Sequence, residues 1–189
     1  MKNIALIAIS GLACHAASAG TYGITLIFDA DGDPYQESIL SPGSHTWTVY
    51  ASFTGVGPDG YFGGFVGSFL SSGVGSVSNW TTLMGGNATT PIAEGGDWTN
   101  INIFNSALLG TDDPLNPIAI ATFDSELVYG FEFTGVDGTA SLFPDGGIFT
   151  LPLTVGPPGI SVLSDYQIPA PGALAALGLG GVIASRRRR

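Results

Sequence analysis

The chain has 189 residues, enough for one domain with targeting segments, and a formal net charge of −10. Its five basic residues are Lys2 and Arg186–Arg189, so without them the charge falls from −10 to −15. A body free of lysine and arginine cannot neutralise phosphates or anionic lipids. We therefore exclude nucleic acid as a partner and expect membrane contact only through the C-terminal segment, before that segment is processed.

Residues 1–19 have the three parts of a signal peptide. Lys2 supplies the positive start, and Ile4–Leu12 (IALIAISGL) is an apolar run too short to span a bilayer. Ala17-Ser18-Ala19 then presents the small residues that signal peptidase recognises. We predict that signal peptidase cuts after Ala19 and that the mature chain starts at Gly20.

The single cysteine, Cys14, lies inside this signal peptide. The mature domain is therefore expected to contain neither a thiol nor a disulfide and to depend on its hydrophobic core. A lipoprotein is the alternative, because Cys14 follows an apolar run. Its motif has leucine three residues before the cysteine, where this chain has Gly11.

The body, residues 20–167, alternates apolar and polar residues with the period of a half-buried strand. The alternation is clearest in residues 45–54 and 126–133. Shorter candidate strands are Gly23–Phe28, Tyr61–Leu70, Trp98–Phe104, Pro117–Phe123, Thr139–Phe143, Gly147–Thr154 and Ile160–Leu163. We predict an all-β fold, an antiparallel β-sandwich of about eight or nine short strands. A signal helix before it and a hydrophobic helix after it are expected to flank this domain.

Turn residues separate the predicted strands. The expected turns are Asp31-Gly32, Ser41-Pro42-Gly43, Asp59-Gly60, Gly85-Gly86, Asp137-Gly138, Asp145-Gly146 and Gly156-Pro157-Pro158-Gly159. They support many short antiparallel connections rather than long helices.

Four carboxylates, Asp29, Asp31, Asp33 and Glu37, form the best candidate for metal binding. Alternating oxygen ligands suit Ca²⁺, but an EF-hand has glycine and glutamate where this loop has Pro34 and Leu40. A looser Ca²⁺ site and a solvated acidic loop both remain open. We assign no metal residues and no cofactor.

His45 is the only histidine outside the signal peptide, so any Ser-His-Asp or Cys-His mechanism depends on it. Its register places it on the apolar face of a strand, which favours a structural role. The body contains no cysteine to complete a zinc site and no arginine or lysine to orient a substrate. We predict no catalytic residues and no enzymatic activity, with glycoside hydrolysis by paired carboxylates as a distant alternative.

Aromatic residues suggest a second function. Trp80 and Trp98 stand among Ser, Thr, Asn and Gly, which predicts partial exposure, and Tyr61–Phe65 is a further aromatic cluster. Exposed rings can stack on sugars, whereas Trp47 fits a core position by its alternation. A carbohydrate-binding surface is therefore the alternative function.

The C-terminal tail, residues 168–189, has three parts in order. Pro169-Ala170-Pro171 is stiff, because each proline restricts its own φ and the residue before it. Gly172–Ala184 is apolar but rich in glycine, and Arg186, Arg187, Arg188 and Arg189 follow. A helix over residues 172–185 rises only about 21 Å, against a bilayer core of about 30 Å. This segment is a marginal anchor, with a plain tail anchor or a basic tail as the alternatives.

These three parts resemble the PEP-CTERM sorting signal of exopolysaccharide-producing Gram-negative bacteria. The resemblance implies that an exosortase recognises the Pro169-Ala170-Pro171 region and releases or transfers the protein outward. Ala170 stands where the family's name-giving glutamate would be, a form associated with planctomycete-like members. The resemblance covers about 20 residues and leaves the identity of the matching exosortase open.

The positive-inside rule agrees, because Lys2 and the arginines stay inside and the cation-free body crosses readily. We expect an inner-membrane intermediate and then a protein at the cell surface or in the extracellular matrix. Its expected partners are signal peptidase and an exosortase, with exopolysaccharide or Ca²⁺ as further candidates. The mature domain is expected to be structural or adhesive.

Overall fold

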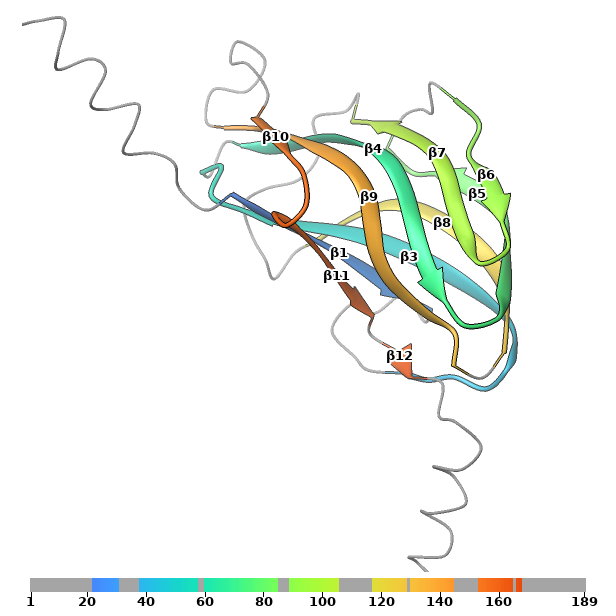
Figure 1. Ribbon diagram of the computed structural model, residues 1–189. Helices are drawn as coiled ribbons and strands as arrows, with labels where there is room; N and C mark the ends of the chain where they lie inside the picture. The colour runs from blue at the N-terminus through green and yellow to red at the C-terminus, as the bar shows by residue number, and fades with distance from the viewer. Residues whose placement is uncertain are drawn as a thin grey trace, which may run out of the picture.

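Figure 1 shows the protein as a computed structural model, which describes residues 22–30, 38–57, 60–84, 89–105, 117–128, 130–144, 153–164 and 166–167. These residues contain twelve strands and no helix, so the predicted all-β fold is confirmed for this part of the chain. Eight strands have five residues or more, and the other four have two or three. The two helices predicted to flank the domain fall outside the described residues.

The first sheet has the strand order β11-β1-β3-β8-β5. Its strands are β1 (Gly23–Asp29), β3 (Gly43–Thr54), β5 (Gly75–Thr82), β8 (Ile118–Leu127) and β11 (Ile160–Ser164). All neighbours are antiparallel except β1 and β11, the first and last strands of this sheet, which run parallel. In this sheet the expectation of antiparallel strands is thus correct except at this edge.

The second sheet has the order β10-β9-β4-β7-β6 and is antiparallel throughout. It contains β4 (Tyr61–Ser72), β6 (Ile92–Glu94), β7 (Asp97–Phe104), β9 (Glu132–Phe143) and β10 (Leu153–Val155). A short parallel pair, β2 (Ser38–Ile39) with β12 (Tyr166–Gln167), lies apart from both sheets.

Aromatic rings hold the two sheets face to face. Phe28 of the first sheet stacks on Phe133 of the second, with ring centroids 4.3 Å apart, and meets Phe69 edge-on at 5.1 Å. Trp47 meets Phe133 edge-on at 5.6 Å. Such pairs add to the hydrophobic gain from burying the rings, so the core lies between the sheets as in a β-sandwich.

The period-two prediction is confirmed in β3. Trp47, Val49, Ala51 and Phe53 are all buried, whereas the residues between them are only partly so. The pleat sends alternate side chains to opposite faces, and only one face of this sheet meets the second sheet. The hydrophobic pattern alone therefore predicted correctly which residues of this strand face the core.

The expected strand over residues 126–133 is wrong. The structure ends β8 at Leu127 and begins β9 at Glu132, with a turn between them that Gly130 enters at φ +82°. The Phe131 amide donates to the Val128 carbonyl at 3.1 Å, which closes the turn. Leu127, before the turn, and Phe131, after it, are both buried in the core. The apolar alternation therefore continues across the turn, although the chain reverses its direction there.

Asp137-Gly138 is not a turn but the middle of β9. Gly138 pairs directly with Gly67 of β4, and their φ angles are +159° and +154°. A Cβ on Gly67 would lie 2.2 Å from the Asp137 carbonyl oxygen, and one on Gly138 2.3 Å from that of Val66. Glycine is needed here because two backbones approach closely, not because the chain turns.

Candidate functional site

Most of the predicted site residues lie outside the described residues. This holds for the cleavage residues Ala17, Ala19 and Gly20, for the sorting residues Pro169, Ala170 and Pro171, and for Arg186–Arg189. Asp31, Asp33 and Glu37 of the predicted Ca²⁺ loop are likewise outside. Asp29 is described, at the end of β1, and its side chain is 0% exposed.

His45 is half-buried at the start of β3. Its Nε2 lies 2.7 Å from the Ser41 carbonyl oxygen, within hydrogen-bond distance. The ring thereby connects the strand to the turn that precedes it. Within the described residues no group of three or more His, Cys, Asp or Glu side chains could hold a metal ion.

Trp98 is buried, with 3% of its surface exposed, so its expected exposure is wrong. Trp80 is half-buried, and its ring stacks on Phe123 at 6.1 Å and meets Trp98 at 5.1 Å. In the Tyr61–Phe65 cluster all three aromatic rings are buried as well. Trp98 and the rings of the Tyr61–Phe65 cluster belong to the core, whereas Trp80, whose expected partial exposure is confirmed, packs against it. The buried rings do not make the sugar-stacking surface that the sequence suggests.

Two asparagines interrupt the regular alternation of the strands beside these tryptophans. Asn79 has φ +57° and lies where the pairing of β5 with β8 shifts, between Ser78 and Thr81. Asn100 has φ +58° and lies where the β4–β7 pairing shifts. An extra residue in a strand reverses the alternation beyond it, and asparagine tolerates positive φ better than most residues. The sequence carries no distinctive signal for this arrangement, because Asn102 also precedes an apolar residue and yet pairs regularly with Val66.

Two carboxylates face outward from β8 and form the carboxylate hollow with β3 and β5. It measures about 310 Å³ and is lined by Ser44, His45, Thr46, Ser78, Asn79, Asp124, Ser125 and Glu126. The Thr46 hydroxyl donates to Asp124 Oδ1 at 2.7 Å, and Asn79 Nδ2 donates to Asp124 Oδ2 at 2.8 Å. The Ser44 hydroxyl donates to Glu126. These bonds join neighbouring strands, so the hollow contributes cross-strand stability.

The donors from Asn79 and Thr46 lower the pKa of Asp124 below its ordinary value, because they stabilise the charged form. A lowered folded-state pKa contributes stability that is fully present above the unfolded value of about 3.9. That contribution is lost as the pH falls through the folded-state pKa.

We therefore expect Asp124→Asn to be less stable than the wild type at neutral pH, by at most about 1 kcal/mol for this surface site. The difference should shrink below pH of about 3.9. Urea unfolding at several pH values measures it. Thr46→Val, which removes one donor, should lose part of the same pH-dependent contribution. A stability difference between wild type and Asp124→Asn that stays constant down to low pH would contradict the lowered pKa of Asp124.

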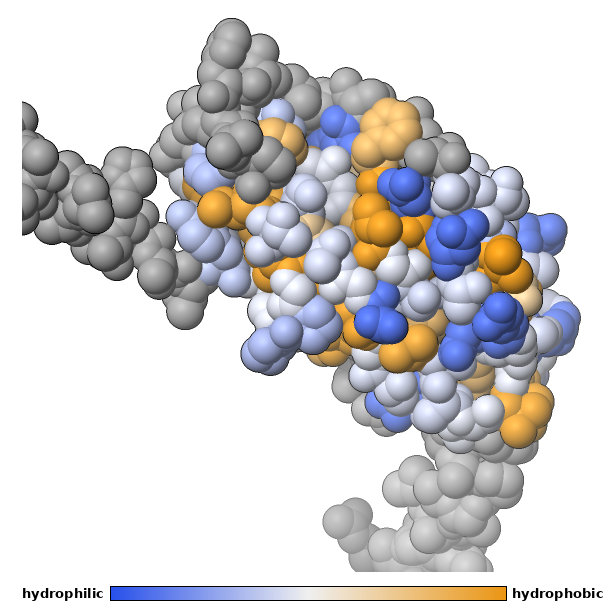
Figure 2. Space-filling model, turned by 45° about the horizontal axis from the view of Figure 1, so that its top comes forward, coloured by the Kyte–Doolittle hydropathy of each residue, from blue (hydrophilic) through white to orange (hydrophobic). Residues whose placement is uncertain are grey.

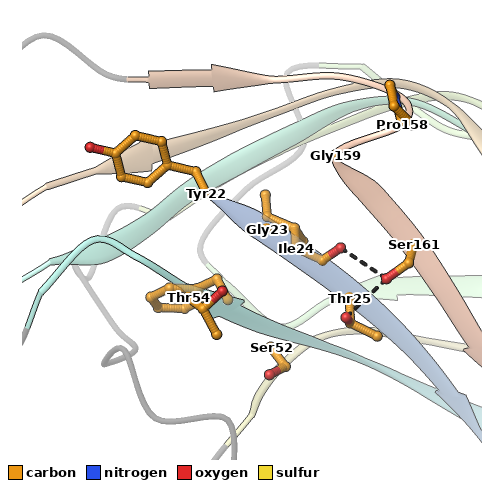
Figure 3. Close-up of a pocket in the computed structure, with 10 residues that line it drawn as sticks. Tyr22, Gly23, Ile24, Thr25, Ser52, Thr54, Pro158, Gly159 and Ser161 are labelled. Atoms are coloured by element: carbon orange, nitrogen blue, oxygen red, sulfur yellow. Dashed lines mark hydrogen bonds between the residues drawn. The ribbon is translucent and has the colours of Figure 1, made fainter. Parts of the chain in front are cut away.

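The hydroxyl hollow, of about 490 Å³, lies at one end of the first sheet where β1, β3 and β11 meet. Its lining residues are Tyr22, Gly23, Ile24, Thr25, Ser52, Phe53, Thr54, Pro158, Gly159 and Ser161. The Ser161 hydroxyl lies 3.0 Å from that of Thr25 and donates to the Ile24 carbonyl at 3.3 Å (Figure 3). The lining carries hydroxyls from five residues and no carboxylate, lysine or arginine.

The sequence contains no signal for the hydroxyl hollow. Its residues come from three segments, and Thr25 and Ser161 are 136 positions apart. Only the pairing of the first and last strands of the first sheet brings them together.

Exposed hydrophobic residues are spread over the described surface. On the face drawn in Figure 2, hydrophobic spots alternate with hydrophilic ones. The most exposed of the large ones are Val66, Val74, Leu83, Ile92, Phe104, Val128 and Leu163, which belong to several strands and turns. Such scattered exposure is ordinary for a folded domain.

No protein-family model, curated protein or solved structure matches this chain. Among the described residues, no helix is long and apolar enough to cross a membrane.

Proposed function

We propose that this chain is an exported protein whose tail is processed by an exosortase-type enzyme. Its body then serves at the cell surface or in the extracellular matrix as a structural or adhesive module without catalytic activity. One observation carries the proposal: Pro169-Ala170-Pro171, a weak apolar segment and Arg186–Arg189 follow a body free of lysine and arginine. Arginine is costly to move through hydrocarbon, so this cluster retains the tail at the cytoplasmic side until the chain is cut.

We expect Pro169→Ala combined with Pro171→Ala to block processing and leave a membrane-bound precursor. The prolines keep the segment extended, the form in which a protease usually takes a chain into its cleft. Deleting Arg186–Arg189 should instead weaken membrane retention. The measurement is fractionation and intact mass of tagged protein from a host with and without its exosortase, with processed protein starting at Gly20.

Pro42→Ala is the matched control, because this exposed turn proline lies in the body and should leave processing unchanged. The sorting proposal fails if the protein keeps residues 172–189 and stays in the membrane whether or not the exosortase is present. A diacylated Cys14 would replace the predicted cleavage with the lipoprotein alternative.

Carbohydrate binding is the second candidate function, and the hydroxyl hollow is the observation that favours it. Its volume of about 490 Å³ is within the range of small-molecule sites. Hydroxyls of Ser52, Thr54 and Tyr22 can exchange hydrogen bonds with sugar hydroxyls, while the acidic body disfavours anionic glycans. The ligand class that fits is therefore a neutral oligosaccharide.

We expect Ser52→Ala with Thr54→Val to weaken binding of a neutral oligosaccharide by about tenfold, as the loss of one or two hydrogen bonds implies. Calorimetric titration with oligosaccharides of glucose, galactose and mannose measures the affinity. Ser76→Ala removes an exposed hydroxyl from β5 and is the control. If the wild type does not bind these sugars, or if the double variant binds them as tightly as the Ser76→Ala control, this role for the hollow is excluded.

A further inference from the structure

The first and last strands of the first sheet are neighbours and run in the same direction. Five residues of β1 pair with five of β11, from Ile24 opposite Ile160 to Phe28 opposite Ser164. The Ile24 amide donates to the Gly159 carbonyl at 3.1 Å, and the Thr25 and Ser161 hydroxyls add a side-chain bond at 3.0 Å. The pair forms one edge of the first sheet. Through it, the strand that begins the sheet in the sequence is hydrogen-bonded to the strand that ends it.

Parallel pairing places the ends of the domain at opposite ends of the same sheet. The chain enters β1 from Tyr22, and it leaves β11 at Ser164, opposite Phe28 at the far end of β1. Figure 1 shows β1 and β11 side by side, with β12 beyond the end of β11. Tension between Tyr22 and the C-terminal side of β11 therefore acts along the strands and pulls them in opposite directions.

Such tension shears the pair. In shear, the hydrogen bonds of all five registered positions share the load, because neither strand can move without displacing every bond. If the same strands were pulled apart from one end, the bonds would break one after another.

Side-chain packing adds resistance to sliding. Ile160 is buried and Val162 packs against the core, whereas Ser161 and Leu163 are exposed. A shift of one residue along β1 would turn the exposed pair inward and the apolar pair outward, because side chains alternate with a period of two. The strand must therefore lose its packing before it can form a new register.

We infer that this domain has a mechanical function: the β1–β11 pair is a clamp that resists tension between the C-terminal side of the domain and its opposite end. Its use in the cell rests on the proposed function, in which the processed body serves at the cell surface as an adhesive module held through its C-terminal side. The hydroxyl hollow lies at the Tyr22 end, opposite the C-terminal end of β11.

Single-molecule force spectroscopy on the full chain tests the inference. Cys14→Ser removes the only native thiol, so paired cysteines define where force is applied. Tyr22→Cys with Leu163→Cys loads the clamp in shear, and Tyr22→Cys with Pro157→Cys opens it from one end. We expect a severalfold higher unfolding force in the first geometry at the same loading rate, since forced unfolding follows the barrier along the pulling direction.

Thr54→Cys with Leu163→Cys is a second shear arrangement, because Thr54 pairs with Gly23 at the Tyr22 end. It should also require a high force. Urea midpoints that agree among the variants show that force differences report geometry rather than stability. Equal forces in the shear and opening geometries would overturn the clamp. That result would leave tail processing untouched, and a failure of tail processing would not change the measured forces.

Discussion

Trp47→Ala is expected to lower the free energy of unfolding by about 3–5 kcal/mol, which is a large part of the stability of a domain this size. Trp47 is 0% exposed, and its ring contacts Phe123 and Phe133. Its Nε1 donates to the buried Ser125 hydroxyl at 2.6 Å. The substitution creates a cavity between the sheets and also removes the partner of Ser125. Urea unfolding followed by circular dichroism measures the loss.

Two variants separate these contributions. Ser125→Ala keeps the ring but removes the acceptor of the Trp47 N–H, which should cost about 1–3 kcal/mol. Trp80→Ala is the matched control, because Trp80 is only half-buried and should give a clearly smaller loss than Trp47→Ala. Equal losses at Trp47 and Trp80 would contradict the packing described for the two rings.

Gly67→Ala and Gly138→Ala are each expected to destabilise the domain by about 2–4 kcal/mol, because overpacking and backbone strain add. Each new Cβ would lie 2.2–2.3 Å from a carbonyl oxygen of the partner strand, and each residue has positive φ. Moving the strands apart would relieve the overlap only by weakening the β4–β9 pairing at the centre of the second sheet. Thermal and urea unfolding of both variants tests this.

Gly135→Ala is the control on β9, because a Cβ there meets no heavy atom within 4 Å. It should change stability by less than about 1 kcal/mol in either direction. If Gly67→Ala and Gly138→Ala unfold at the same urea concentration as Gly135→Ala, the close approach of the strands is not a constraint on this fold.

Local patterns determined the fold class and many of the strands. In β3, every second residue from Trp47 to Phe53 is apolar and buried. A strand with only one face toward the core is enough to explain this pattern. Turn residues before β11 were also correctly predicted, with the Gly159 amide donating to the Gly156 carbonyl at 2.8 Å. These features depend on residues close together in the chain, so the sequence carries them directly.

The sequence also carries the export and sorting predictions, since signal peptidase and an exosortase read short linear segments. The tertiary structure decided what depends on distant partners. The sequence predicts a turn at Asp137-Gly138, but the pairing of Gly138 with Gly67 makes it the closest approach of two long strands. Trp98 looks exposed among polar neighbours, yet the bulge at Asn100 and the opposite sheet bury it.

The β1–β11 pair is the clearest case of a feature that only the tertiary structure decided. Nothing in the apolar alternation of residues 23–29 or 160–164 specifies which strand lies beside them or in which direction it runs. Pairing between residues 136 positions apart depends on how the intervening strands fold. The clamp and the hydroxyl hollow therefore arise from topology, because strand order and direction are properties of the assembled sheets.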